Sequence, residues 1–236
     1  MARQGPSRPL RDRIVTMAGR FDDTPDIAGD LVAIAVLCAD RISPVAYASV
    51  TSRYEGAYAT VAASSDLALQ VDNAQYAEDA GPCLDAVDGD YPVAVPEIST
   101  TMTWPGFRDV AFKLGLRASL SIPLFAARGT AVAALNLYAH DPNTMKALTA
   151  SVWSVYESDV LPGRDLEGVD EGGEELVTGL AGAFAVQARI QRSLGVLMSA
   201  IGCTADEAFA ALHLRAVETD ATVTEVAERL LGGNRW

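Results

Sequence analysis

The sequence has few of the residues that build metal centres and catalytic sites. Its 236 residues include three cysteines and two histidines. Cys38, Cys83 and Cys203 form neither an even disulfide set nor a CxxC pair of metal ligands. The two histidines, His140 and His213, are too few for most zinc, haem and triad chemistries. We therefore expect reduced thiols, no metal, no cofactor and no enzymatic activity.

Basic residues and long apolar runs are also scarce. The chain has 18 Lys and Arg against 31 Asp and Glu, a net charge of −13. This charge argues against broad adhesion to nucleic acid or anionic membranes, so any contact with RNA must be local. The longest apolar run, Leu31 to Ala39, is far shorter than the roughly 18 residues of a membrane span. The basic N-terminus lacks an apolar signal region, and we expect a soluble, cytoplasmic protein.

An acidic, glycine-containing segment divides the chain. Residues 161–175 show almost no apolar periodicity and are predicted to form a solvated connector. The connector separates an N-terminal domain, residues 1–160, from a C-terminal region, residues 176–232. The two regions have different sequence patterns, which predict two separate domains.

The N-terminal region has a mixed helix and strand pattern. Neither GxGxxG nor GxxxxGK[ST] follows a strand, so the phosphate cradles of dinucleotide and P-loop proteins are excluded. We expect an α+β domain with a five- or six-stranded, mainly antiparallel sheet and flanking helices. Helices are predicted at 26–41, 81–90, 107–115 and 148–160, and strands at 45–54, 56–65, YPVAVPEI, SLSIPLFAA and TAVAALNLYAH.

The C-terminal region begins with a long helical pattern. Its apolar residues recur at alternating steps of four and three, the a/d spacing of a coiled coil over three heptads. This spacing predicts a homodimer seam, in which Gln187 would fix the register. The alternative is that the stripe packs on helices of its own chain. The predicted seam consists of Leu176, Leu180, Ala183, Gln187, Ile190, Leu194 and Leu197.

Two short helices are predicted after the long one. Gly202 is suited to end the long helix. Thr204 with Glu207, and Thr222 with Glu225, have the spacing of capping boxes and begin the second and third helices. The C-terminal end is therefore expected to be a compact three-helix module.

The segment from Ile190 to Leu231 resembles an ANTAR domain, the RNA-binding output module of bacterial antitermination regulators. The motifs GPCLDA, YPVAVPEI, WPGF, LRASLSIPLF and AALNLY in the preceding region resemble the GAF sensor domain that actinobacterial proteins fuse to it. The resemblance implies a homodimer that binds paired stem-loops of a nascent transcript under control of the sensor. The strongest ANTAR matches are Ile190, Gly195, Leu197, Met198, Ala208, Phe209, Leu212, Val226 and Ala227.

The sequence departs from the ANTAR pattern at several basic positions. Ser193 and Leu194 replace alanine and lysine, His213 replaces arginine, and Asp220 and Thr222 replace asparagine and lysine. Residues 187–236 hold five arginines against six acidic residues, which is a weak RNA footprint. The alternatives are solvated arginines beside the seam and a degenerate module that binds protein instead of RNA. The candidate RNA-binding residues are Arg189, Arg192, His213, Arg215 and Thr222.

Three residues are candidates for binding an unknown small molecule at the sensor. Cys83 lies at a predicted helix start, where the helix dipole would lower its pKa and favour redox sensing or nucleophilic attack. Its alternative is a small buried apolar residue. The resemblance places Trp104 and Phe107 in the segment that lines GAF ligand pockets, although a plain lid is equally consistent. His140 is interpreted as a polar residue at a strand end.

Overall fold

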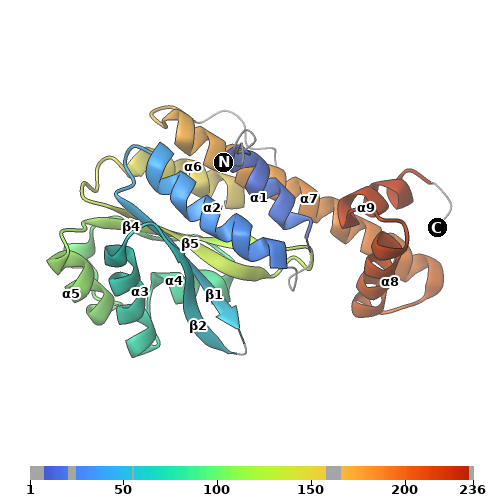
Figure 1. Ribbon diagram of the computed structural model, residues 1–236, viewed down its shortest axis with the longest axis horizontal. Coiled ribbons are helices and arrows are strands. Elements are labelled where there is room, and N and C mark those ends of the chain that lie inside the picture. The colour runs from blue at the N-terminus through green and yellow to red at the C-terminus, as the bar shows by residue number, and fades with distance from the viewer. Residues whose placement is uncertain (1–7, 21–24, 55, 158–165, 234–236) are drawn as a thin grey trace, which may run out of the picture.

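The computed structural model describes residues 8–20, 25–54, 56–157 and 166–233. Its centre is one antiparallel sheet of five strands in the order β2-β1-β5-β4-β3 (Figure 1). The predicted α+β class and the predicted hairpin are confirmed. The strands are β1 (Tyr47–Tyr54), β2 (Ala57–Ala63), β3 (Val93–Val95), β4 (Ala118–Phe125) and β5 (Ala131–Ala139).

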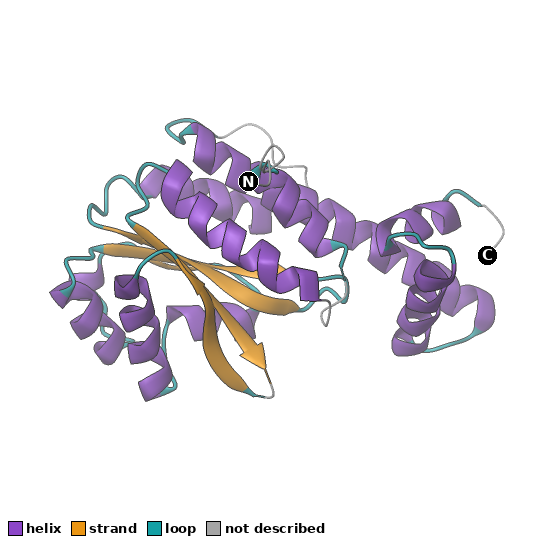
Figure 2. Cartoon of the chain, viewed as in Figure 1, coloured by secondary structure: helices purple, strands orange, loops and turns teal. Residues whose placement is uncertain are grey.

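Helices cover both faces of the sheet (Figure 2). One face carries α1 (Leu10–Ala18), α2 (Pro25–Arg41), α6 (Lys146–Glu157) and the first half of α7 (Glu171–Ile201). The other carries α3 (Asp66–Glu78), α4 (Pro82–Gly89), the 3-10 turn η1 (Ile98–Thr100) and α5 (Pro105–Lys113). The helices predicted in the N-terminal region are present within a few residues of their expected bounds.

Two helices in the N-terminal region were not predicted. The nine-residue α1 contains Arg11, Asp12 and Arg13, which interrupt its apolar pattern. The buried face of α3 includes the polar residues Asp72 and Gln75, so this helix lacks the apolar periodicity by which the others were recognised. Both helices depend on tertiary packing, which short helices need to be stable in water.

The long helix α7 begins inside the predicted connector. Residues 161–165 lie outside the described residues, whereas 171–175 form the first helical turn, capped by Asp170. The carboxylate of Glu175 accepts a hydrogen bond from Leu10 N at 2.9 Å and pairs with Arg41 at 3.2 Å. The predicted boundary at residue 176 therefore falls within a continuous helix that is attached to the N-terminal domain.

The predicted dimer seam is wrong, because its residues are buried within the chain itself. Each of the seven side chains is at most 8% exposed. The first half of the stripe packs against α1, which approaches closely at Gly182, where an added Cβ would lie 2.6 Å from the side chain of Val15. Gln187 does not face a symmetry mate, because its amide donates to Ala18 O at 2.7 Å and Ala126 O at 2.5 Å. The alternative of packing within the chain is the observed one.

The C-terminal half of α7 continues into a three-helix module with α8 (Ala205–Glu218) and α9 (Val223–Leu231). Gly202 ends α7 in the left-handed conformation with φ of 68°, as expected. Both predicted capping boxes are present: Thr204 with Glu207 and Thr222 with Glu225. The module lies at the end of α7 that is remote from α6 (Figure 1).

The apolar face of the sheet should dominate stability. Leu120 on β4 is completely buried against the helical layer, whereas Val61 on β2 is 43% exposed. We expect Leu120→Ala to lower the free energy of unfolding by about 2–5 kcal/mol. Val61→Ala, the matched control on an edge strand, should change it by about 0.5 kcal/mol or less. Urea denaturation followed by circular dichroism measures both, and equal effects would contradict this assignment of the core.

Candidate functional site

A group of polar side chains is buried on the sheet face opposite α1 and α2. Alternation along β4 and β5 directs Leu120 and Leu137 to one face and their polar neighbours to the other. Ser121 pairs with Asn136, and Asn136 pairs with Ser49, so these three side chains lie in a row across the sheet. We call the whole group the polar cluster. It consists of Ser49, Thr51, Thr60, Asp72, Gln75, Tyr76, Ser119, Ser121, Asn136 and Tyr138.

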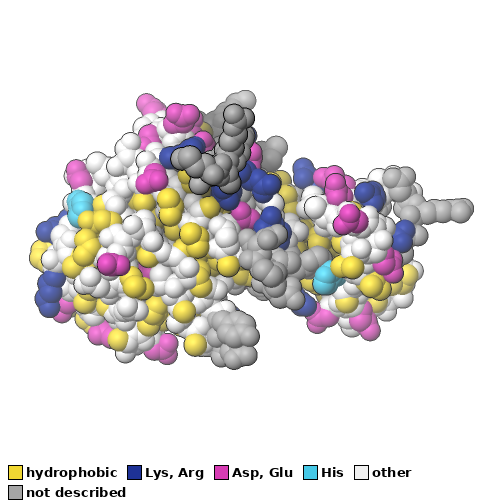
Figure 3. Space-filling model, viewed as in Figure 1, with side chains coloured by type: hydrophobic (Ala, Val, Ile, Leu, Met, Phe, Trp, Pro, Cys, Tyr) yellow, Lys and Arg dark blue, Asp and Glu magenta, His cyan; other side chains and the backbone are white. Residues whose placement is uncertain are grey.

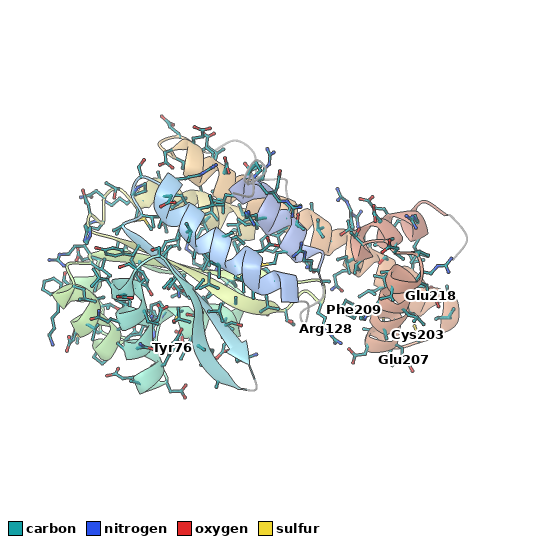
Figure 4. The ribbon with its side chains drawn as sticks, viewed as in Figure 1. Tyr76, Arg128, Cys203, Glu207, Phe209 and Glu218 are labelled. Carbon is teal, nitrogen blue, oxygen red and sulfur yellow. The ribbon has the colours of Figure 1, made fainter. Side chains whose placement is uncertain are left out.

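Asp72 on α3 is the charged centre of the polar cluster. One carboxylate oxygen accepts from Tyr138 OH at 2.6 Å and the other from Thr60 Oγ1 at 2.8 Å. Tyr76 is labelled in Figure 4, and its hydroxyl lies 2.8 Å from Thr60 Oγ1 and 2.9 Å from Thr51 Oγ1. The network therefore links α3 to strands β1, β2 and β5.

Two buried polar atoms of the cluster have no hydrogen-bond partner among the described residues. They are Asn136 Oδ1 and Ser119 Oγ, on side chains that are 0% and 3% exposed. A buried polar atom without a partner costs roughly 1–3 kcal/mol, so native proteins usually satisfy it with a protein group, a water or a ligand. These two atoms therefore retain unused hydrogen-bonding capacity.

Burial raises the pKa of Asp72 to about 6, and hydrogen bonds from Tyr138, Ser49 and Thr60 limit the rise. Removing a carboxylate from water disfavours its charged form, whereas donors that point at it favour that form. The protonation state of Asp72 therefore changes close to neutral pH. A proton or a cationic group at this position would relieve the buried negative charge.

Cys83 lies beside the polar cluster but lacks a reactive thiol environment. It is fully buried at the start of α4, and its backbone N–H donates to Gln75 Oε1 at 3.0 Å. Burial raises the pKa of its thiol, and the nearby carboxylate of Asp72 raises it further. The predicted lowering by the helix dipole is wrong, because desolvation outweighs the dipole here. The reading as a small buried residue fits this position.

Trp104 and Phe107 lie next to the same region. Phe107 on α5 is fully buried in an apolar cluster that also contains Tyr138, so it packs close to the polar cluster. Trp104 precedes α5 and packs against that cluster and against a second one that contains Ala86 and Ala134. The structure therefore brings all three candidate sensor residues around one region beneath the sheet.

The sequence interpretation missed the centre of this region, which is Asp72. A signal for it exists, since Asp72, Gln75 and Tyr76 are spaced as one face of a helix and follow Ser65, which caps α3. Polar residues at helical spacing are normally predicted to face solvent. Here Asp72 and Gln75 are buried, because this side of α3 packs against the polar face of the sheet.

The five candidate RNA-binding residues lie on the three-helix module. Arg189 pairs with Glu228 at 3.5 Å, and Arg215 pairs with Glu218 at 3.4 Å. Arg192 is exposed, and its Nε donates to Ala188 O at 3.1 Å. Acidic and basic side chains are interspersed on the face of the module shown in Figure 3. Each arginine thus has a local partner rather than belonging to a continuous basic patch.

The remaining two candidates, Thr222 and His213, are less accessible for contact with RNA. The Thr222 hydroxyl accepts from Glu225 N at 3.2 Å and lies 3.1 Å from the Glu225 carboxylate, so its observed role is to cap α9. His213 is half-buried on α8. Whether any of the five residues touches RNA stays a prediction.

A surface cavity of about 610 Å³ lies elsewhere. It is lined by the α2–β1 loop, by the residues that follow β5 and by those that precede α7. His140 lines it, and the Nδ1 atom of this residue lies 3.0 Å from Gly115 O. The described residues contain no group of three or more potential metal ligands. No single described helix has the length and apolar composition of a membrane span, although α7 and α8, bent by 107°, meet that criterion as a pair.

The buried carboxylate predicts a specific pH dependence of stability. The pKa of Asp72 in the folded protein is raised above its ordinary value of 3.8, so the folded state binds the proton more tightly than the unfolded state. Stability from this group is therefore present below about pH 4 and is lost as the pH rises through about 6. As the pH rises across this range, the free energy of unfolding of Asp72→Asn should increase by about 3 kcal/mol relative to that of the parent.

Urea denaturation of the parent and of Asp72→Asn across this range measures the difference, in which the titration of shared groups cancels. Asp88→Asn is the matched control, because Asp88 is half exposed and pairs with Arg53 at the surface. A stability difference between the parent and Asp72→Asn that does not vary with pH would refute the raised pKa.

Comparisons with known proteins assign the C-terminal module. The model of the ANTAR domain family matches residues 178–231. This segment covers most of α7 and all of α8 and α9, so it begins within the helix that also packs on the N-terminal domain. No curated protein sequence matches the chain.

Several solved structures are similar to the chain at low identity. The nlh2 GAF domain of A. aeolicus is 9% identical, with a TM-score of 0.44, and the match covers 75% of this chain and 94% of that one. The type II free methionine-R-sulfoxide reductase of Thermoplasma acidophilum is 11% identical, with a TM-score of 0.42, over 67% and 95% of the two chains. The fRMsr of Staphylococcus aureus is 11% identical, with a TM-score of 0.42, over 77% and 97%.

The five-stranded sheet with helices on both faces and the family match at the C-terminus agree with the resemblance read from the sequence. The chain therefore consists of an α+β domain followed by a helical module, and residues 178–231 of that module match the ANTAR domain family.

Proposed function

We propose that this chain is a signal-responsive, RNA-binding regulator of transcription antitermination. The observation that carries the proposal is the ANTAR match over residues 178–231, on a module whose long helix is continuous with the GAF-like domain. ANTAR domains act on RNA, and a continuous helix offers a direct mechanical connection between sensor and output. In this role the chain is a regulator without catalytic activity that acts on nascent transcripts in the cytoplasm.

Arginine pairs on the module supply the chemistry for RNA contact. Arg189 and Arg192 are three residues apart on α7 and point to neighbouring parts of its surface. The Arg189–Glu228 pair is exposed, at 42% and 53%, and such pairs are worth about 1 kcal/mol or less. A phosphate can therefore compete for the guanidinium, since Arg–phosphate contacts are charge-assisted and often bidentate.

The sensor ligand is proposed to be a small polar molecule held at the polar cluster. The partnerless atoms Asn136 Oδ1 and Ser119 Oγ support this position, and Trp104 and Phe107 lie beside it. A ligand that binds one arrangement of the sheet and α3 more tightly shifts the population toward that arrangement. The buried thiol of Cys83 supports packing rather than redox sensing.

A homodimer remains part of the proposal, but it requires a surface other than the predicted seam. The stripe on α7 is buried within the chain. Apolar side chains that are exposed on the module include Ile201 at 66%, Leu214 at 61% and Val217 at 67%. Exposed apolar residues of this size favour contact with another protein surface. Analytical ultracentrifugation of the full chain determines whether a dimer forms.

RNA binding by the full chain tests the proposal. Cross-linking in cells and sequencing of the bound RNA would identify target stem-loops, which are then titrated with purified protein from about 50 to about 200 mM salt. We expect Arg189→Ala and Arg192→Ala each to weaken binding and to reduce the salt slope by about 1, as loss of one phosphate contact does. Arg53→Ala is the control, because it removes the same charge from a surface pair on the GAF-like domain.

The opposite results support a second candidate function. If cross-linking recovers no more RNA than an unrelated acidic protein does, or if both arginine variants bind RNA like the parent, RNA regulation through these residues is refuted. The exposed Leu214 and Val217 and the excess of acidic residues in the module would then favour an output that binds protein.

A further inference from the structure

The turn between β4 and β5 reaches from the GAF-like domain to the ANTAR module. The guanidinium carbon of Arg128 lies 4.8 Å from the centre of the Phe209 ring on α8. Its Nη1 atom lies 3.5 Å from the Asp206 carboxylate, also on α8. Figure 4 shows Arg128 at the junction of the two parts of the molecule, near Phe209. One side chain of the sheet domain therefore stacks on the helix that follows α7.

The same turn is held against α7 by two glutamines. The amide of Gln187 donates to Ala126 O at 2.5 Å and to Ala18 O at 2.7 Å, and it is 8% exposed. One turn further along α7, the amide of Gln191 donates to Arg128 O at 3.2 Å. The backbone of the turn is thus tied to α7, while the Arg128 side chain extends to α8.

The strands on either side of the turn both contribute side chains to the polar cluster. Ser119 and Ser121 lie on β4, and Asn136 and Tyr138 lie on β5, directly opposite them in the register. Ala126 lies five positions after Ser121, a distance of about 17 Å along an extended strand. The two paired strands therefore form a direct covalent and hydrogen-bonded link between the polar cluster and the Arg128 contact.

The packing of α7 is stronger than the contacts between Arg128 and α8. The apolar stripe of α7 belongs to the large core and holds this helix in place. The side chain of Arg128 is 54% exposed and that of Asp206 is 92% exposed, so both contacts of Arg128 to α8 are weak surface contacts. A small displacement of β4 and β5 would therefore alter the weak contact to α8 before it disturbed the packing of α7.

We propose that the β4–β5 turn couples the polar cluster to the ANTAR module, with Arg128 as the positioning residue that carries the change to α8. The inference extends the proposed function, because it names the route by which the sensor would act on the output. It does not depend on which ligand binds or on whether the module contacts RNA.

Hydrogen exchange in the full chain tests the coupling without a ligand. Tyr138→Phe perturbs the polar cluster on β5 by removing the hydroxyl that donates to Asp72, with little change in shape. We expect this variant to raise exchange of α8 amides, and Arg128→Ala to raise it about two- to fivefold. In the double variant, Tyr138→Phe should add nothing to the effect of Arg128→Ala on α8. Arg128→Lys keeps the charge and should be intermediate.

Arg215→Ala is the matched control, because it removes an arginine that pairs within α8 with Glu218 and has no contact to the turn among the described interactions. In that background Tyr138→Phe should still raise exchange in α8. If Tyr138→Phe leaves α8 unchanged, or if its full effect persists without Arg128, the proposal is overturned. Should Tyr138→Phe fail to fold, Thr51→Val provides a second test, because it removes the hydroxyl that accepts a hydrogen bond from Asn136 on β5 at 2.9 Å. Failure of RNA binding with intact coupling would refute the proposed output alone.

Discussion

The structure depends on one continuous helix that is part of both domains. The 31-residue α7, about 46 Å long, buries a single apolar stripe along its length. One hydrophobic cluster extends from Leu10 on α1, through this stripe, to Ala227 on α9. The α+β domain and the ANTAR module therefore share a core through α7. Any signal between them must pass through or beside a helix that is held by its packing.

The two faces of the sheet have different physical roles. The face toward α1, α2 and α7 is apolar and densely buried, which sets stability and fixes α7. The face toward α3 carries the hydrogen-bond partners of Asp72. The low dielectric there strengthens each hydrogen bond and raises the cost of an unpaired polar group. Protonation of Asp72 changes the charge of this face and leaves the apolar face unaltered. The paired strands β4 and β5 belong to both faces and end at the turn that contacts α8.

The distribution of charge limits how the C-terminal module can attract nucleic acid. The protein carries a net charge of −13, and arginines such as Arg189 and Arg215 are paired with carboxylates on the module itself. Attraction to nucleic acid at long range is therefore weak, and the proposed RNA contact would require a phosphate to replace a carboxylate at short range.

The sequence by itself determined the class of the fold, most of the elements and the ends of the C-terminal helices. Period-two alternation in β4 and β5 and the capping boxes at Thr204 and Thr222 are local features, so they can be recognised without knowledge of distant contacts. Tertiary structure alone decided what covers the α7 stripe, since an apolar seam has the same spacing whether it meets another copy or its own α1. It also decided that Asp72 is interior and that the pKa of the Cys83 thiol is raised. Burial by other elements, which no local pattern encodes, sets the energetic cost of charge.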